Sequence, residues 1–513
     1  MPEMTRRSAL KIVAASGVGL VVGGSVGAGQ LDELSTMPEA LSISNDEWFA
    51  QRVWSVSANR VLIPKNGADG GVTSLAKRIY RPSSADEIAE IVRSFPASTP
   101  IACVCGGHES SNAAMVASQE AVILDLNQLK AIEFTSSDEE TLVKVGSGVV
   151  FRELVEAVKL QGGALPVGTG PGVGVVGYIT NGGLSSYFSR RLGLLGQRVA
   201  KMTVVTAAGE ICVLTPEDEL FTTMLGAGSA LAIVADVTLR LATANVVKGS
   251  EQRVFGFETR DQAVQYAREA MGFMREQVIP NEAVSLEIVV SGNKAIVATT
   301  TFYDNFDGDP NAFVKPLEDL ASNMKLTCLA QAHWASWYEA AAALWPVIAQ
   351  MRGNPLATLN HCVGTQGIPS DEVLDFVSET MVGEAPFDEA PLSILEIRTL
   401  GGAAQKGPRV PSGNCEHAFF ADFITLYDAA PKSAEERKAI VDATNGVMNN
   451  ARKVEGLNVD FSGTHSQPDD PTRTVVPSEI FGSVNMAAQV LSVKKKMDPE
   501  NRLRFHPFAR ILA

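Results

Sequence analysis

The sequence predicts an α+β fold, in which short strands alternate with amphipathic helices and glycine-rich turns connect them. Two observations carry this prediction: apolar runs of strand length bounded by turn residues, and helical patterns with a polar cap ahead of an apolar face. A third observation is the density of glycine between Gly162 and Gly183. The length of 513 residues corresponds to about three domains.

The first helix is expected after Ser83 and Ser84, because hydroxyl caps and acidic residues precede an apolar face of Ile88, Ile91 and Val92. The elements that follow are expected in this order: strands at 101–104, 121–126 and 143–145, a helix at about 151–161, strands at 202–206 and 211–214, a small-residue loop at 226–229 and a strand at 233–241.

From about residue 246 glycine thins out and longer amphipathic elements appear, which predicts a second domain over 246–474. Its expected elements are a helix at 259–274, strands at 283–290 and 295–302, an aromatic helix at about 334–350, a strand at 393–400 and a helix at 433–454. The tail begins with a further helix from about residue 480 and ends in an Arg- and Phe-rich terminus.

The glycine-dense stretch contains a literal G-x-G-x-x-G at Gly172, Gly174 and Gly177. It is not interpreted as a dinucleotide-binding fingerprint, because no clean strand precedes it, a glycine pair rather than a helix follows it, and no acidic residue lies about 20 positions on. Backbone lying flat against a large planar ligand explains the missing side chains. The alternative is an irregular loop that needs positive φ angles.

Composition excludes several classes of function. The net charge of −15 argues against a nucleic-acid partner, and the one dense basic run, Lys494 to Lys496, is typical of a solvated helix face. The six cysteines form no Cys-x-x-Cys pair and no zinc spacing, so no metal site is expected. Cys103 and Cys105 alternate on one strand and are interpreted as buried small hydrophobes rather than redox groups.

The amino terminus has the layout of an export signal. Arg6 and Arg7 precede an apolar, Gly-rich stretch that ends in small residues near Ala28. This predicts a Tat-type signal peptide over residues 1–28 and export of the folded protein, with a soluble tail as the alternative. The stretch is too short and too glycine-rich for a membrane span.

The segment 100–112 carries the chemistry of a cofactor-attachment loop. A short strand runs into Gly106 and Gly107, which let backbone N–H groups approach a pyrophosphate, while Ser110 and Ser111 add hydroxyl donors. His108 offers an imidazole nitrogen beside the cofactor. The alternative is a tight turn with a surface histidine.

Together these residues resemble the FAD-linked oxidases of the vanillyl-alcohol oxidase superfamily, whose FAD-binding domain is of the PCMH type, and within it the berberine-bridge-enzyme-like group. Val104 to His108 resembles the family's R-x-G-G-H loop, with valine in place of arginine. Gly168 to Gly177 resembles the second glycine signature, with Gly170 where bicovalent members carry cysteine. Further similarity lies at 187–193, 219–234, 480–485 and 493–501.

The resemblance implies a two-part PCMH-type FAD-binding domain, formed by residues 75–245 and a returning C-terminal segment at 475–513. An inserted substrate domain of antiparallel sheet covered by helices occupies 246–474, and residues 29–74 form a lead-in. It also implies FAD bonded covalently to His108, without a second bond at Gly170. Val173 matches a position on the family's oxygen route, where a small residue favours oxidase behaviour.

Carried onto this sequence, the FAD-binding residues of the family are Cys105, Gly106, Gly107, His108, Glu109, Ser110, Ser111, Gly168, Thr169, Gly172, Val173, Gly174, Gly177, Tyr178, Gly182, Gly183, Val234 and Asn485.

The expected function is oxidation of an alcohol, a sugar or a secondary-metabolite intermediate, with O2 reduced to H2O2. A dehydrogenase with another electron acceptor and a flavin-loaded binding protein without turnover are the alternatives. The family often uses a tyrosine as base, but Ile480 and Phe481 occupy that segment. Glu396, Tyr178 and His417 are the candidate bases. For Glu396 the alternative is an exposed salt-bridged strand face, and for Tyr178 it is core packing.

Overall fold

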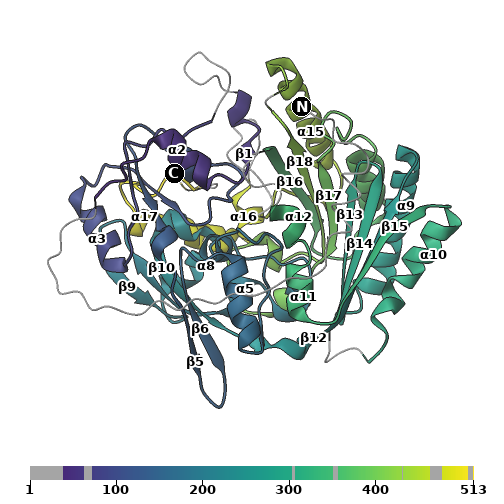
Figure 1. The fold of residues 1–513 in the computed structure, drawn as a ribbon, viewed down its shortest axis with the longest axis horizontal. Coiled ribbons are helices and arrows are strands. Elements are labelled where there is room, and N and C mark those ends of the chain that lie inside the picture. The colour runs from purple at the N-terminus through teal and green to yellow at the C-terminus, as the bar shows by residue number, and fades with distance from the viewer. Residues whose placement is uncertain are drawn as a thin grey trace.

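The computed structural model describes residues 39–62, 72–302, 307–349, 356–429, 431–462, 476–506 and 512. The expected signal peptide at 1–28 lies outside these residues. Two sheet-based halves lie side by side (Figure 1), one formed mainly by residues before 245 and one by residues after it. This arrangement confirms the predicted α+β fold.

The first half begins with a small parallel sheet that carries the His108 loop at its edge. Ser84 accepts a hydrogen bond from the Glu87 N–H and so starts the amphipathic helix that covers this sheet. The elements are α2 (Asn45–Arg52), β2 (Arg78–Tyr80), α3 (Ala85–Ser94), β3 (Ile101–Val104), α4 (Ala113–Val116) and β4 (Val122–Asp125), with strand order β2-β4-β3.

A five-stranded antiparallel sheet completes the first half, in the order β5-β6-β10-β8-β9. Its strands are β5 (Ile132–Ser136), β6 (Thr141–Gly146), β8 (Val199–Val205), β9 (Ile211–Leu214) and β10 (Ile233–Arg240). The helices of this region are α5 (Phe151–Leu160), α6 (Val175–Ile179), α7 (Ser189–Leu192) and α8 (Glu219–Leu231), and β7 (Gly163–Ala164) pairs with β11 (Ala242–Thr243).

The second half is a nine-stranded sheet in the order β1-β16-β18-β17-β13-β14-β12-β15, with β19 beside β16. Its strands are β1 (Val56–Ser57), β12 (Val247–Gly256), β13 (Val284–Ser291), β14 (Lys294–Phe302), β15 (Thr327–Trp334), β16 (Ala357–Thr365), β17 (Ile394–Thr399), β18 (Phe419–Tyr427) and β19 (Asn458–Val459). All pairs are antiparallel except β1 with β16.

Helices cover one face of this large sheet (Figure 1). They include α9 (Arg260–Phe273), α10 (Lys315–Asn323), α13 (Asp371–Asp375) and α15 (Ala434–Ala451). Alternate residues of the strands, such as Leu286, Ile397 and Phe423, are buried in the apolar core under the helices. The opposite face of β16, β17 and β18 is therefore left for the first half of the molecule. Other short helices are α11 (Trp337–Ala342), α12 (Trp345–Ala349) and α14 (Ala403–Lys406).

The end of the chain returns to the first half through α16 (Pro477–Ile480) and α17 (Val484–Met497). The expectation of a solvated helix face holds for Lys495 and Lys496 but was wrong for Lys494, which is buried. The Lys494 ammonium donates to the Ala230 carbonyl at 2.8 Å and to Asp498 at 2.7 Å. Arg502 donates to the backbone carbonyls of Ala207 and Val92. These contacts give Lys494 and Asp498 of the C-terminal motif a structural role. The predicted domain boundaries at 75, 246 and 475 stay predictions.

Three local expectations were wrong. Residues 226–229 belong to helix α8, with non-helical backbone only at Ala227, since their small side chains pack closely against neighbouring segments. The aromatic helix at 334–350 is two short helices that follow strand β15. Inside the glycine stretch, a short helix, α6, forms where a loop was expected.

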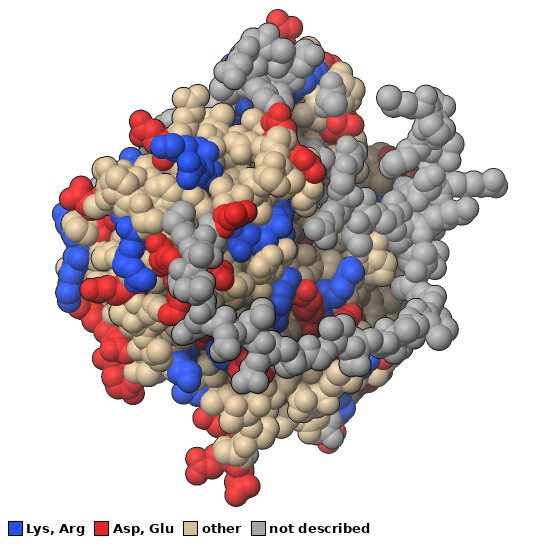
Figure 2. All heavy atoms as spheres, turned by 60° about the vertical axis from the view of Figure 1, so that its left-hand side comes forward, with Lys and Arg blue, Asp and Glu red and all other residues tan. Residues whose placement is uncertain are grey.

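No helix in the described ranges is long and apolar enough to cross a membrane. On the face shown in Figure 2, Lys and Arg side chains are interspersed with Asp and Glu, and neither sign forms a continuous patch.

Candidate functional site

The His108 loop is fixed by close backbone contacts where β3 ends. Gly107 has φ of +70°, and a Cβ there would collide with the Arg52 carbonyl oxygen, so only glycine fits. Asn112 ties the other end of the loop down: its side chain accepts from the Ser57 N–H at 2.7 Å and donates to the Ser55 carbonyl at 2.9 Å. The loop therefore has one defined conformation beside the N-terminal segment.

The two predicted glycine loops pack against each other. A Cβ on Gly174 would lie 2.7 Å from the Gly106 nitrogen and 3.0 Å from Cys105 Cβ. A Cβ on Gly177 would meet nothing within 4 Å, although Gly177 lines a cavity. Gly106 and Gly174 thus permit the close approach of the two loops, and Gly177 keeps the cavity wall free of a side chain.

These loops line a cavity of about 400 Å³ that reaches from the glycine loops to the open face of the large sheet. It runs between the two halves of the molecule. The residues expected at the site that do line it are Cys105, Gly106, Gly107, His108, Glu109, Ser110, Gly168, Thr169, Val173, Gly174, Gly177, Tyr178, Val234 and Glu396.

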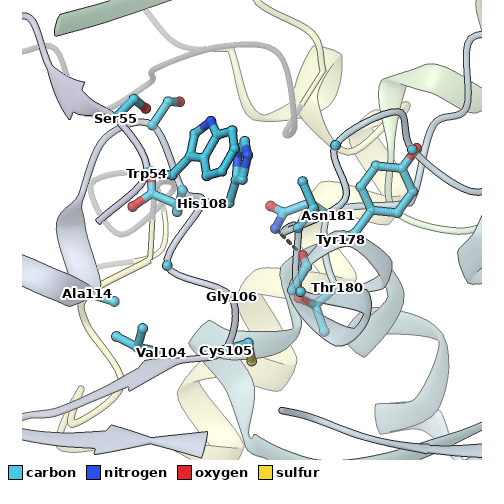
Figure 3. A pocket seen from close by; sticks show the side chains of 18 of the residues that line it. Trp54, Ser55, Val104, Cys105, Gly106, His108, Ala114, Tyr178, Thr180 and Asn181 are labelled. Atoms are coloured by element: carbon cyan, nitrogen blue, oxygen red, sulfur yellow. Dashed lines mark hydrogen bonds between the residues drawn. The ribbon is translucent and has the colours of Figure 1, made fainter. Parts of the chain in front are cut away.

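His108 lies in this cavity with its imidazole stacked on the indole of Trp54 (Figure 3). The ring centroids are 4.6 Å apart and the planes differ by 22°. A Cβ on Gly170 would lie 3.6 Å from His108 Nε2, which puts the position of the missing family cysteine next to the histidine. The structure therefore places His108 and Gly170 side by side.

Several predicted residues do not line the cavity. Ser111 is buried, and its carbonyl accepts from Arg60 Nε at 2.6 Å. Gly182 and Gly183 have positive φ and pack against Ser412 and Leu195, so they form a structural turn. Gly172 lies behind the wall, where an added Cβ would contact Trp54 at 3.7 Å, and Asn485 is exposed on the first turn of α17.

Glu109 lines the cavity but its carboxylate serves the loop itself. It accepts hydrogen bonds from the backbone N–H groups of Ser111 at 2.6 Å and Ala113 at 2.9 Å. Burial raises the pKa of Glu109, and these hydrogen bonds oppose the rise. Burial likewise raises the pKa of the Cys105 thiol to about 12, which keeps it protonated and inert, as expected for a structural cysteine.

A buried cluster of charges lies on the cavity face of the large sheet. Arg398 Nε donates to Glu287 at 2.9 Å, and Arg398 Nη2 pairs with Asp422 at 3.4 Å and with Glu396. Burial would lower the pKa of Arg398, but the neighbouring carboxylates of Asp422 and Glu287 hold it above its ordinary value. We call Glu287, Glu396, Arg398 and Asp422 the carboxylate cluster; Glu396 and Arg398 line the cavity.

The alternative of an exposed salt-bridged strand face holds for the ion pair between Glu396 and Arg398 but not for the exposure, because the Glu396 side chain is 16% exposed and lines the cavity. Its partner Arg398 is held between three carboxylates from three strands.

The structure argues against the other two candidate bases. The Tyr178 hydroxyl donates to the Leu184 carbonyl and points away from His108 in Figure 3, and burial raises its pKa. His417 does not line this cavity. Its imidazole stacks on the ring of Phe461 with centroids 3.6 Å apart, and it borders a separate cavity of about 210 Å³. Burial lowers the His417 pKa to about 4.

Sequence reasoning missed several cavity residues. Trp54 follows α2 in a segment with no recognisable pattern. Thr358, Asn360, Ile424 and Leu426 lie on β16 and β18, two strands that were not predicted. The charge of Asp422 in the middle of an apolar strand pattern was the signal that could have found β18.

The lining residues fit FAD. The backbone of Gly106 and Gly174 lines the cavity and Gly177 leaves its wall free of a side chain, which suits a pyrophosphate and a flat ring. The aliphatic Val173 and Val234 suit the faces of an isoalloxazine. No group of His, Cys, Asp and Glu side chains in the described residues is arranged to hold a metal ion.

Comparison with known proteins agrees with this geometry. The FAD binding domain family model matches residues 76–215. An alditol oxidase from Streptomyces sp. is 31% identical over 34% of this chain and 41% of its own length, and berberine bridge enzyme-like 24 from Arabidopsis thaliana is 26% identical over 51% and 49%. The chain thus matches less than half the length of either relative.

Solved structures share the fold. Glucooligosaccharide oxidase from Acremonium strictum, described with a 6-S-cysteinyl, 8α-N1-histidyl FAD, has a TM-score of 0.70 at 17% identity and covers 87% of this chain and 97% of its own. 6-Hydroxy-D-nicotine oxidase from Arthrobacter nicotinovorans has a TM-score of 0.67 at 18% identity, over 93% and 99%.

The fold and the cavity define an FAD-binding protein with a second, sheet-based half that closes the cofactor cavity. Residues 76–215 form an FAD binding domain, a berberine bridge enzyme-like protein is among the sequence relatives, and the fold is shared with VAO-type flavoproteins and oligosaccharide oxidases.

Proposed function

We propose that this protein is an FAD-dependent oxidase that removes two electrons from a small molecule bearing a hydroxyl or an amine and passes them to O2, giving H2O2. One observation carries the proposal: a single cavity joins the two glycine loops and His108 to Glu396 on the facing sheet. The sugar and alcohol oxidases among the similar proteins support the reaction class.

Bound flavin would supply two-electron oxidation of a carbon next to the heteroatom. Within the chain, Glu396 is the proton acceptor for the substrate's hydroxyl or amine, since it is the carboxylate of the cluster that lines the cavity. Arg398 fixes the orientation of Glu396 and keeps its own charge through Glu287 and Asp422. Glu287 and Asp422 beside them are 4% and 0% exposed, so the side of the cluster that faces the sheet is shielded from solvent.

His108 is proposed as the covalent anchor of the flavin, supported by its place in the cavity and its stack on Trp54. Gly170 offers no thiol, so a single bond is expected rather than the two of the glucooligosaccharide oxidase. Val173, which lines the cavity next to Gly170, is proposed to leave room for O2.

Export through the Tat pathway is proposed from the twin arginines Arg6 and Arg7 and the small-residue end of the apolar stretch. Covalent attachment would keep the cofactor with a protein that works outside the cytoplasm.

Purification and absorbance spectroscopy test the cofactor, and oxygen consumption tests the acceptor. We expect a yellow protein whose substrate-reduced form is reoxidised by O2 with one H2O2 formed per turnover. Fast reduction of an artificial dye with negligible peroxide would favour the dehydrogenase. A yellow protein that no substrate panel reduces would favour the binding protein, and a colourless protein would contradict FAD binding.

A further inference from the structure

The open face of the large sheet defines the substrate end of the cavity. Because side chains alternate along a strand, every second residue of β16, β17 and β18 points to this face. Across the sheet, Asn360 is paired with Ile424, which is in turn paired with Ile394, and Thr358 is paired with Leu426. All five of these residues line the cavity.

This surface is mainly aliphatic. Its apolar wall consists of Ile348, Leu356, Ile394, Ile424 and Leu426. The two uncharged polar side chains on the same strands bond to each other, with Thr358 Oγ1 donating to Asn360 Oδ1 at 2.9 Å. A ligand with many hydroxyl groups would bury them against carbon, and each buried hydroxyl without a partner weakens binding. The apolar wall therefore favours a compact ligand with a hydrocarbon skeleton.

The charge next to the apolar wall is negative. The carboxylate cluster combines three carboxylates with one guanidinium, and Arg398 already uses its Nε and Nη2 on them. Glu287 and Asp422 are 4% and 0% exposed, so water does little to disperse their charge. Arg398 offsets part of this charge, but the carboxylates outnumber the guanidinium, and Glu396 is the carboxylate of the cluster that lines the cavity. A positive charge on the open side of Glu396 would therefore be attracted mainly by this carboxylate, whereas a neutral hydroxyl would not.

We propose that the substrate is a compact, largely apolar amine, bound with its cationic nitrogen against Glu396 and its carbon skeleton against the apolar wall. This inference rests on the proposed function for its cavity and its cofactor, but it concerns recognition. It separates this chain from the oligosaccharide oxidases that share its fold, because their substrates present hydroxyl groups and no positive charge.

Three probes test the proposal at neutral pH, where the amine is protonated: N-methylbenzylamine, benzyl alcohol and cellobiose. Binding to the purified flavoprotein without oxygen is followed by the change in flavin absorbance, and the rise in melting temperature is recorded on the same samples. We expect the amine to half-saturate at a concentration at least tenfold lower than benzyl alcohol. Cellobiose should produce neither signal.

Two variants assign the effect to its residues. Glu396→Gln should abolish the preference for the amine over the alcohol. Glu282→Gln removes a carboxylate that is paired with Lys406 at 2.6 Å and does not line the cavity, so it should keep the wild-type preference. Ile424→Asn should weaken binding of both aromatic probes at least fivefold.

Tighter binding of cellobiose or benzyl alcohol than of the amine would overturn the proposal, and so would an amine preference that survives Glu396→Gln. The proposed function fails in a different way, by absence of flavin from the protein. Stabilisation by the amine without flavin would leave the recognition proposal standing and remove the oxidase.

Discussion

Replacing Glu396 by glutamine removes the proposed proton acceptor and keeps the shape of the side chain. Arg398 would keep its hydrogen bond to Glu287 at 2.9 Å and its ion pair with Asp422 at 3.4 Å. The cluster would then hold two carboxylates and one guanidinium in place of three and one. Because the arginine stays paired, we expect folding and flavin content to be unchanged.

The catalytic loss should be large by comparison. General bases contribute a factor of about 10² to 10⁴ in rate, which corresponds to about 3 to 5 kcal/mol of activation free energy. The assay measures, without oxygen, the rate at which a compound that the wild-type enzyme oxidises reduces the bound flavin. The flavin occupancy of each sample is measured as well.

Glu282→Gln is the matched control and should reduce flavin at the wild-type rate, because this carboxylate lies outside the cavity. A Glu396→Gln protein with full flavin and a rate within threefold of wild type would refute the role of Glu396.

Three further predictions concern residues around the site. Trp54→Ala removes the aromatic stack on His108, which is worth about 0.5–1.5 kcal/mol, and should slow covalent flavin attachment by about two- to tenfold. Trp54→Phe should restore most of the rate, which is followed as a time course of in-gel flavin fluorescence. Arg190 is 3% exposed and donates to five backbone carbonyls, so Arg190→Met should lower the unfolding free energy by at least about 3 kcal/mol, seen as a lower urea midpoint. Burial lowers the pKa of His417 from 6.5 to about 4, so as the pH falls the unfolded state takes up this proton before the folded state does. The unfolding free energy should therefore fall by up to about 3 kcal/mol between pH 6.5 and pH 4. The fall should be smaller in His417→Gln; equal pH dependence of the two melting temperatures would contradict this cause.

The sequence carried enough information for the cofactor half, because its elements are set by local patterns. Ser84 and the spacing of Ile88, Ile91 and Val92 define α3, and the apolar run at 101–104 is strand β3. Gly106 and Gly174 are required where two backbones touch, a constraint that leaves a visible trace in composition. The position of His108 follows from these turns.

The substrate half was harder, because its site depends on tertiary pairing. Glu287, Glu396 and Asp422 are far apart in sequence and meet only through the register of β13, β17 and β18. Trp54 and His108 are also far apart in sequence, and the hydrogen bonds of Asn112 to the backbone of Ser55 and Ser57 hold their two segments together. The small residues of 226–229 predicted a loop, yet tight packing against neighbours such as Pro411 allows them to be helical. Tertiary contacts overrode local propensity at these positions.

The most direct test of the account is the mass of the denatured protein, compared between wild type, His108→Ala and His333→Ala. His333 lies on the exposed strand β15 and serves as the control histidine. We predict that wild type and His333→Ala carry the added mass of one FAD and fluoresce in a denaturing gel, and that His108→Ala carries neither signal. Flavin that stays bound to denatured His108→Ala, or leaves denatured wild type, would contradict the anchor at the centre of this account.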